Sequence, residues 1–148
     1  MICVVQRVST ARVAVQTPSY VAEISYGLCV LLGIEKGDNQ DQAIWMAHKL
    51  ANLRIFQDAN GKMNRSVVDE EGEILLISQF TLAGDCRTGN RPSFIGAANP
   101  TIAEPLVDYV GETLIKSHGV PVSKGVFGAN MQVTIVNEGP VTLVIKRD

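Results

Sequence analysis

The sequence predicts an α+β fold (mixed α/β) of one domain, with two facing β-sheets and helices on one outer face. Three observations predict it. The 148 residues are 46% apolar and 19% charged, which is typical of a globular chain with a substantial core. Roughly eight segments have the composition of strands, and about two have the apolar period of a helix. Because two helices cover only part of such a sheet, a second sheet must cover the rest, and we expect residues 1–148 to form this single domain.

The chain opens with predicted strands. Residues 2–7 and 12–15 are rich in β-branched side chains, and residues 21–24 follow a turn of Thr, Pro and Ser. Residues 28–34 are apolar throughout, as expected of a central strand that is covered on both faces. This apolar run is far too short to span a membrane.

Residues 41–52 are predicted to form the first helix. Asp38 is the expected N-cap, and Asp41 lies in the first turn, where the helix dipole favours an acid. The expected buried stripe consists of Ala43, Ile44, Ala47, Leu50 and Ala51. His48 lies off that stripe, so we interpret it as a surface residue rather than a catalytic one.

The middle of the chain is predicted to contain two strands and a tight turn. Residues 53–56 have strand character, and Asn60-Gly61 is a pair that type I′ turns favour. Residues 74–77 are apolar without alternation, which predicts a strand in the core of the sheet.

A second helix is predicted to begin at Asn99. Its expected buried stripe consists of Ala103, Leu106, Val107, Val110 and Leu114. Gly119 fits the left-handed position beyond the C-terminus of this helix. His118 precedes it, where a cation suits the helix dipole, so we interpret His118 as structural.

Charge and cysteine content exclude several classes of protein. The net charge of −2 gives no global basic field, which argues against a general DNA or RNA coat protein but not against a local patch that grips one end of an RNA. Cys3, Cys29 and Cys86 lack metal or C-x-x-C spacing, so we expect reduced thiols in a cytoplasmic protein. The first residues lack the organisation of a signal peptide. No metal or other cofactor is expected, since no cluster of His, Cys, Asp and Glu has ligand spacing.

The first candidate site follows the core strand. Ser78, Gln79 and Thr81 interrupt the apolar run, with Phe80 between them. Burying such a polar group without a partner costs about 1–3 kcal/mol. Either the strand surfaces there and these side chains face water, or it ends in a pocket whose polar lining they form.

A loop with two arginines lies directly downstream of this segment. Arg87 and Arg91 are either solvated loop charges or a phosphate clamp, since the planar fork of arginine suits phosphate oxygens. A loop beside a suspected pocket is a natural place for such a clamp.

The second candidate site is N-E-G-P-V-T at residues 137–142. It lies between predicted strands at 131–136 and 141–145, and a further strand is expected at 122–127. Asn, Gly and Pro together predict a turn, and base rates favour a plain hairpin connection. Either isomer of the Gly139-Pro140 bond is open, because glycine has no Cβ to clash with the proline.

Six segments of the sequence resemble, in matching order, the D-aminoacyl-tRNA deacylases of the bacterial and eukaryotic type. They are Gln6-Arg7-Val8, Asn64, S-Q-F-T-L at 78–82, R-P-S-F at 91–94, M-Q-V at 131–133 and N-E-G-P-V-T at 137–142. The likeness runs from Met1 to about Ile145. Its most specific motifs are S-Q-F-T-L and N-x-G-P-V-T.

The resemblance implies a hydrolase that cleaves the ester between an amino acid and the 3′-terminal ribose of tRNA. It implies acceptance of D-amino acids and glycine and rejection of L-amino acids, which is chiral proofreading in translation. It also implies a cytoplasmic homodimer without membrane association, whose partner is the aminoacylated 3′ end of tRNA. In this family the Gly-Pro bond is cis, and the motif of one subunit reaches into the pocket of the other.

Carried over to this sequence, the resemblance makes Gly139 and Pro140 the chiral selector and Arg7 their brace. It makes the pocket lining Ser78, Gln79, Phe80 and Thr81, with Phe127, Gly128 and Met131 nearby. As the phosphate clamp considered above, Arg87 and Arg91 are candidate tRNA contacts. With the substrate ammonium fixed by the motif, a D side chain points away and an L side chain collides with the backbone, which is rejection by obstruction. Glycine has no side chain to collide.

The attacking group is left open. A nucleophilic Thr81 needs an adjacent base, and neither motif contains a histidine or lysine. The resemblance points instead to assistance by the 2′-hydroxyl of the tRNA, with backbone N–H groups near Phe80 and Thr81 stabilising the oxyanion. Two alternatives stay open: a hydrolase of other small esters that uses Thr81, and a non-catalytic module that binds a tRNA end.

Overall fold

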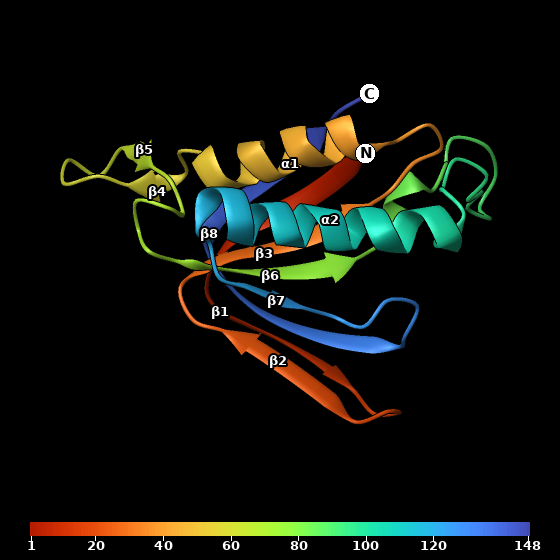
Figure 1. The fold of residues 1–148 in the computed structure, drawn as a ribbon, viewed down its shortest axis with the longest axis horizontal. Helices are drawn as coiled ribbons and strands as arrows, with labels where there is room; N and C mark the ends of the chain where they lie inside the picture. The colour runs from red at the N-terminus through yellow and green to blue at the C-terminus, as the bar shows by residue number, and fades with distance from the viewer.

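The computed structural model describes residues 1–148, with eight strands, two α-helices and one short 3-10 helix (Figure 1). In chain order the elements are β1 (Ile2–Val15), β2 (Tyr20–Ile24), β3 (Gly27–Gly33), α1 (Gln40–Asn52), β4 (Phe56–Gln57), β5 (Met63–Arg65), β6 (Glu73–Ser78), η1 (Phe80–Ala83), α2 (Pro100–His118), β7 (Val122–Lys124) and β8 (Met131–Lys146).

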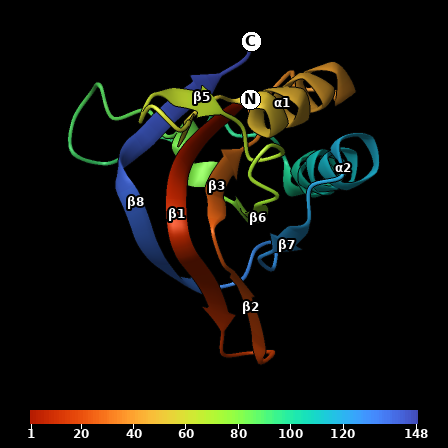
Figure 2. The same cartoon turned by 90° about the vertical axis from the view of Figure 1, so that its left-hand side faces the viewer.

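Six of the strands form one strongly curled sheet around β1 (Figure 2). One edge of β1 pairs antiparallel with β3 along its first half and with β2 along its second half. The other edge pairs with β8 along nearly its whole length. β6 and β7 extend the sheet beyond β3 in parallel. Because β8 pairs with β1 alone, β8 is a long edge strand.

The predicted mixed fold with two helices on one outer face is confirmed, but the two facing layers differ from the prediction. They are not separate sheets: they belong to the one curled sheet, and the second sheet is only the small β4–β5 pair. In Figure 2, α1 and α2 lie together on one side of the curl. A sheet of this length that twists strongly curls without closing, so its two ends face each other across the second core.

Two cores lie on the two faces of this sheet. Leu28, Val30 and Leu32 of β3 face the helices, while Cys29 and Leu31 face the inside of the curl. In β6, the even-numbered residues from Ile74 face the helices and the odd-numbered ones face the curl. This double burial explains why both strands are apolar runs without alternation.

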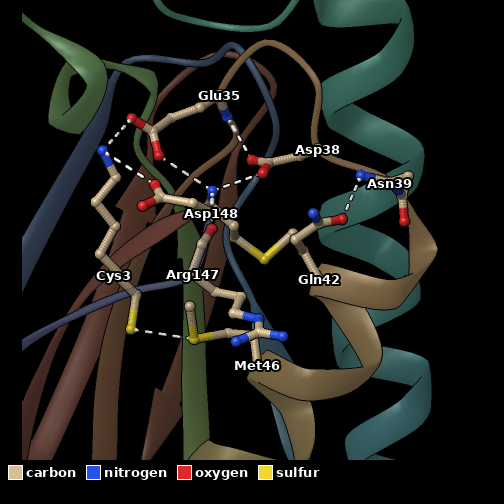
Figure 3. Close-up of polar contacts among 10 residues, drawn as sticks. Cys3, Glu35, Asp38, Asn39, Gln42, Met46, Arg147 and Asp148 are labelled. Atoms are coloured by element: carbon tan, nitrogen blue, oxygen red, sulfur yellow. Dashed lines mark hydrogen bonds and ion pairs between the residues drawn. The ribbon is translucent and has the colours of Figure 1, made fainter.

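The helices match the prediction with two corrections. The N-cap of α1 is Asn39, whose Oδ1 accepts a hydrogen bond from the Asp41 N–H at 2.7 Å. Asp38 is not the cap, because its carboxylate accepts from the N-terminal ammonium of Met1 at 2.6 Å (Figure 3). Ile44 is 45% exposed, and Met46 takes its place in the buried stripe.

The second helix agrees with the prediction throughout. Asn99 caps α2 by accepting from the Thr101 N–H at 3.1 Å. All five residues of the predicted stripe are buried. Gly119 has a φ of 67° and ends the helix in the left-handed conformation.

Several predicted strand boundaries are wrong. Residues 2–7 and 12–15 belong to the single strand β1, and the strand predicted at 53–56 is only Phe56–Gln57. The strand expected at 122–127 ends at Lys124. The turn at Asn60-Gly61 is present but is not type I′, because Gly61 has a positive φ and Asn60 does not.

The largest correction concerns the end of the chain. Residues 131–136 and 141–145 are not two strands joined by a hairpin; both belong to β8, which runs continuously past β1. The pairing register shifts on both sides of Val8, opposite residues 137–142. N-E-G-P-V-T is therefore an irregular segment inside a strand, and it projects from the sheet edge without turning the chain back.

Candidate functional site

A cavity of about 600 Å³, here called the main pocket, lies where the carboxyl end of β6 meets the start of α2. Six residues predicted for the site line it: Ser78, Gln79, Phe80, Phe127, Gly128 and Met131. Most of the remaining wall is apolar. This combination of apolar walls and a few polar groups is typical of a small-molecule site.

The end of β6 positions the polar wall of the main pocket. The Gln79 N–H donates to the Leu32 oxygen at 2.8 Å, which holds the chain against β3 as the strand ends. The chain then turns into η1, which leaves the Phe80 side chain 56% exposed. The Phe80 ring meets the Phe94 ring edge to face, with centroids 5.3 Å apart.

Thr81 lies at the rim and is exposed rather than among the residues that line the main pocket. Its Oγ1 accepts a hydrogen bond from Nε2 of Gln79 at 2.6 Å. The nearest partner of this hydroxyl is thus an amide, which cannot take its proton.

The opposite wall is built by the segment between β7 and β8. The Gly125 N–H donates to the Leu76 oxygen at 3.0 Å, which ties this segment to β6. A Cβ at Gly125 would lie 2.6 Å from Sδ of Met131, so the glycine leaves room for that side chain. Gly128 adopts a φ of 72° in the turn beside Phe127. These contacts hold Phe127 and Met131 at the main pocket.

The Gly139-Pro140 dipeptide lies on the same strand as Met131 but away from the main pocket. Its peptide bond is cis, and both residues are exposed. Gly139 is eight positions beyond Met131, which corresponds to roughly 25 Å along an extended strand. One chain therefore does not bring the two motifs together.

The buried side chain of Arg7 supports the backbone next to the Gly139-Pro140 dipeptide. Arg7 is 6% exposed; its Nε donates to the Glu138 oxygen at 3.1 Å, and its Nη1 donates to the Ile55 oxygen at 2.7 Å. Asn137 closes the segment by donating from Nδ2 to the Arg7 oxygen at 2.9 Å and to the Val141 oxygen at 3.1 Å. The bonds to the Glu138 and Val141 oxygens fix the backbone on both sides of Gly139, and the other two tie Arg7 and Asn137 in place.

The two arginines predicted to contact tRNA lie in the loop after η1. Arg87 forms two side-chain hydrogen bonds with Asp85, at 2.9 and 2.6 Å, and these bonds hold the pKa of the Asp85 carboxyl well below its usual range. Arg91 is exposed. Neither arginine lines the main pocket.

The two histidines and the two buried cysteines do not line the main pocket. His48 is exposed, as predicted, and its ring stacks obliquely against that of His118, with centroids 5.5 Å apart. Burial raises the pKa of the Cys3 thiol to about 12 and that of Cys29 to about 11, so both are inert structural thiols. No three His, Cys, Asp or Glu side chains lie close enough together to hold a metal ion. Neither α1 nor α2 combines the length and the hydropathy that a membrane-spanning helix needs.

Sequence reasoning missed one wall of the main pocket. Small apolar residues from the start of α2 and the segment before it form that wall: Ala97, Ala98, Pro100, Ala103 and Val107. The helical period predicts Ala103 and Val107 as part of the buried stripe of the helix. Their composition carries no signal that separates pocket wall from core, because both surfaces are apolar.

Comparisons with known proteins give a consistent family. The family model described as D-Tyr-tRNA(Tyr) deacylase matches residues 4–146. A D-aminoacyl-tRNA deacylase of Thermomicrobium roseum is 54% identical over 138 residues, which cover 93% of this chain and 88% of that protein. A D-aminoacyl-tRNA deacylase of Geotalea uraniireducens is 51% identical over 147 residues, covering 99% and 93%.

Two solved structures resemble the whole chain. A structure described as c-Myc DNA Unwinding Element Binding Protein superposes with a TM-score of 0.92 at 41% identity, covering 100% of this chain and 99% of that chain. A structure described as a probable eukaryotic D-amino acid tRNA deacylase superposes with a TM-score of 0.83 over 97% of both chains. The second is only 15% identical, so it shows a shared fold alone.

Proposed function

The chain belongs to the D-Tyr-tRNA(Tyr) deacylase family, and from this premise we propose that it hydrolyses D-aminoacyl-tRNA. The ester it cleaves joins a D-amino acid to the 3′-terminal ribose. The observation that carries the proposal is the main pocket, whose polar end is the S-Q-F segment at the end of β6. Its volume of about 600 Å³ suits an adenosine with a small acyl group. Such an enzyme works where translation takes place, in the cytoplasm.

The enzyme acts as a homodimer in which Gly139 and Pro140 of one copy complete the main pocket of the other. Three features support this arrangement. The dipeptide is exposed and roughly 25 Å along β8 from the pocket of its own chain. β8 has an unpaired edge, and Val136 and Val144 on it are 50% and 68% exposed. A long apolar edge strand of this kind favours pairing with another copy.

Chirality is judged by backbone atoms of the dipeptide. A main-chain oxygen of the partner subunit's motif accepts a hydrogen bond from the substrate ammonium. This bond fixes the amino group and the ester together. A D side chain then points out of the site, while an L side chain collides with Gly139 or Pro140. Obstruction of this kind discriminates more strongly than a small difference in attraction. Because glycine has nothing to collide, glycyl-tRNA is also cleaved.

The chemical step relies on the substrate and on backbone groups. The 2′-hydroxyl of the terminal ribose assists a water molecule, which adds to the ester carbon; the 3′-oxygen leaves and takes up a proton. Phe80 and Thr81 begin η1, and a 3-10 helix leaves its first N–H groups without internal acceptors. Such N–H groups at the rim suit the negative oxygen of the tetrahedral intermediate.

Ester loss from matched tRNAs tests the proposal. The protein is incubated with D-tyrosyl-, L-tyrosyl- and glycyl-tRNA, and the remaining ester is followed over time. We expect loss of the D-tyrosyl and glycyl esters and persistence of the L-tyrosyl ester. Tight binding of D-tyrosyl-tRNA without ester loss would instead identify a non-catalytic module. Equally fast cleavage of free D-tyrosine esters would identify a hydrolase of small esters.

A further inference from the structure

A second cavity, of about 910 Å³, shares η1 as a wall with the main pocket. Ser78, Gln79 and Phe80 line the main pocket, whereas Leu82 and Ala83 line the second cavity. Thr81 lies between these two groups of residues. The 3-10 helix therefore separates two hollows, with the Thr81 rim between them.

The segment from Ser93 to Gly96 repeats this division. The Phe94 side chain lines the main pocket, whereas its neighbours Ser93 and Ile95 line the second cavity. Ile95 and Gly96 lie in a turn that the Ala97 N–H closes by donating to the Phe94 oxygen at 3.0 Å. Ser93 is held in place by two backbone hydrogen bonds with Asp85, at 2.7 and 2.9 Å. These backbone hydrogen bonds hold the segment that separates the two cavities.

Two cations and two carboxylates lie around the second cavity, and they form ion pairs with one another. Asp85 pairs with Arg87. Glu35 pairs with the N-terminal ammonium at 3.1 Å and with Lys146 at 3.3 Å, and Lys146 also pairs with Asp148 at 3.5 Å (Figure 3). The Arg87 side chain is 89% exposed and that of Lys146 is 51% exposed. Exposed ion pairs contribute only about 0–1 kcal/mol, so an incoming phosphate can replace Asp85 as the partner of Arg87 at little cost. The Lys146 ammonium has three donors, which leaves one for a phosphate beside its pairs with Glu35 and Asp148.

We propose that the second cavity binds the nucleotide that precedes the terminal adenosine, with Arg87 and Lys146 contacting the phosphodiester between the two. This inference rests on the proposed deacylase function, which puts the ester at the Thr81 rim. There the base and acyl group of the terminal nucleoside fill the main pocket, and its 5′-oxygen continues across η1. A planar guanidinium and an ammonium are the side chains that phosphate recognition favours. The second cavity has room for one nucleotide.

A pair of minimal substrates tests the site. D-tyrosyl-adenosine has no phosphodiester, whereas the 3′-D-tyrosyl ester of cytidylyl-adenosine carries one phosphodiester and one further nucleotide. We expect kcat/KM of the wild-type protein to be roughly tenfold higher for the dinucleotide ester, as for one charged hydrogen-bonded contact. If both esters and D-tyrosyl-tRNA stay intact, the deacylase function itself is refuted. Equal kcat/KM for the two esters would refute the nucleotide site alone.

Variants locate the contact. Arg87→Ala and Lys146→Ala are each expected to lower the dinucleotide-to-adenosine ratio of kcat/KM severalfold. In Arg87→Ala, the slope of log kcat/KM against log salt for the dinucleotide ester should fall by about 0.7, the value for one phosphate contact of a single strand. Lys116→Ala is the matched control, because Lys116 forms an exposed pair with Glu112 and lines neither cavity. The ratio should not change in the control.

Further measurements on these variants distinguish a nucleotide site in the second cavity from a role of that cavity in subunit contact. Light scattering measures the oligomeric state of each variant, and circular dichroism measures its fold. An unchanged ratio in a folded Arg87→Ala, Lys146→Ala double variant would overturn the proposal. So would a loss of activity toward both esters that follows dissociation into monomers, because the second cavity would then serve subunit contact.

Discussion

The guanidinium of Arg7 donates from Nε to the backbone oxygen of Glu138 at 3.1 Å, directly before the Gly139-Pro140 dipeptide. The same guanidinium donates from Nη1 to Ile55, so it connects the irregular segment of β8 to the chain after α1. A buried side chain with 6% exposure thereby fixes the position of an exposed backbone segment. The proposed chiral selector depends on this position.

Replacement of Arg7 tests that support. Arg7→Ala leaves the buried carbonyl oxygen of Ile55 and the partly buried one of Glu138 without this donor, and it should lower the free energy of unfolding by about 2–4 kcal/mol. Arg7→Lys keeps the charge but replaces the planar fork with a single ammonium, so it should restore only part of the stability. Chemical denaturation measures both variants. Full stability in Arg7→Ala would show that the two bonds do not support the segment.

A methyl group at Gly139 tests how tightly the segment is held. A Cβ there would lie 2.7 Å from Oδ1 of Asn137, whose Nδ2 is tied to two carbonyl oxygens. Gly139→Ala should therefore cost about 1–3 kcal/mol of stability, because the amide must move and lose those bonds. The proposed function adds a loss of D-aminoacyl-tRNA cleavage, since the methyl group also enters the site.

A double variant separates the two causes. In an Asn137→Ala background the obstacle is gone, so Gly139→Ala should destabilise the protein less than in the wild type, which a double-mutant cycle measures. The cleavage rate should nevertheless stay low. A cost of Gly139→Ala that is the same in both backgrounds would contradict the contact with Asn137.

Much of this architecture is predictable from local patterns, and the parts that are not depend on distant partners. The apolar runs of β3 and β6 and the stripe of α2 are visible in the sequence, because each follows from the face that the element buries. The cap of α1 is not: Asp38 and Asn39 have equivalent capping chemistry, and the ammonium of Met1, distant in sequence, decides between them.

The candidate site divides in the same way. The polar interruption at Ser78 and Gln79 predicts either a strand end that faces water or a pocket with a polar lining. Both residues line the main pocket. The continuity of β8 was missed, because N-E-G-P-V-T has turn composition, and only the pairing with β1 and the hydrogen bonds of Arg7 keep it in a strand. In the proposed function, this motif completes the pocket of a second copy. The residues around it in the sequence give no indication of that pocket.

Gly27 provides a sharp test of the sheet. A Cβ at this position would lie 1.9 Å from the Glu73 oxygen, where β3 and β6 begin to pair. Gly27→Ala should therefore prevent the pairing of the two central strands, and we expect insoluble or unfolded protein. Gly111→Ala is the matched control, because its Cβ would meet no atom closer than 3.5 Å. In the interior of α2 that change should raise stability by about 0.5–1 kcal/mol. Expression yield and thermal unfolding distinguish the two.

The histidine pair predicts a pH dependence of stability. Burial lowers the pKa of His118 below its ordinary value of 6.5, and His48 lowers it further. The unfolded chain then binds the proton more readily, so this contribution is complete above pH 6.5 and is lost as the pH falls below that value. His118→Gln should flatten the decline of unfolding free energy between neutral and mildly acidic pH. An identical decline in wild type and variant would assign it to other groups.

Thr81 decides between the two chemistries that the sequence allowed. Its hydroxyl accepts from Gln79 at 2.6 Å and has no histidine or lysine beside it to remove its proton. If the ribose of the substrate assists the reaction, Thr81→Ala should lower kcat/KM for D-tyrosyl-tRNA by less than about tenfold, whereas loss of a true nucleophile or its base costs several orders of magnitude. Thr81→Ser is the matched control, because it keeps the hydroxyl and removes only the methyl group. A collapse of activity in Thr81→Ala together with full activity in Thr81→Ser would make Thr81 the attacking group. A substrate with a 2′-deoxy terminal ribose provides the complementary measurement: it should be cleaved slowly by the wild type if the 2′-hydroxyl takes part.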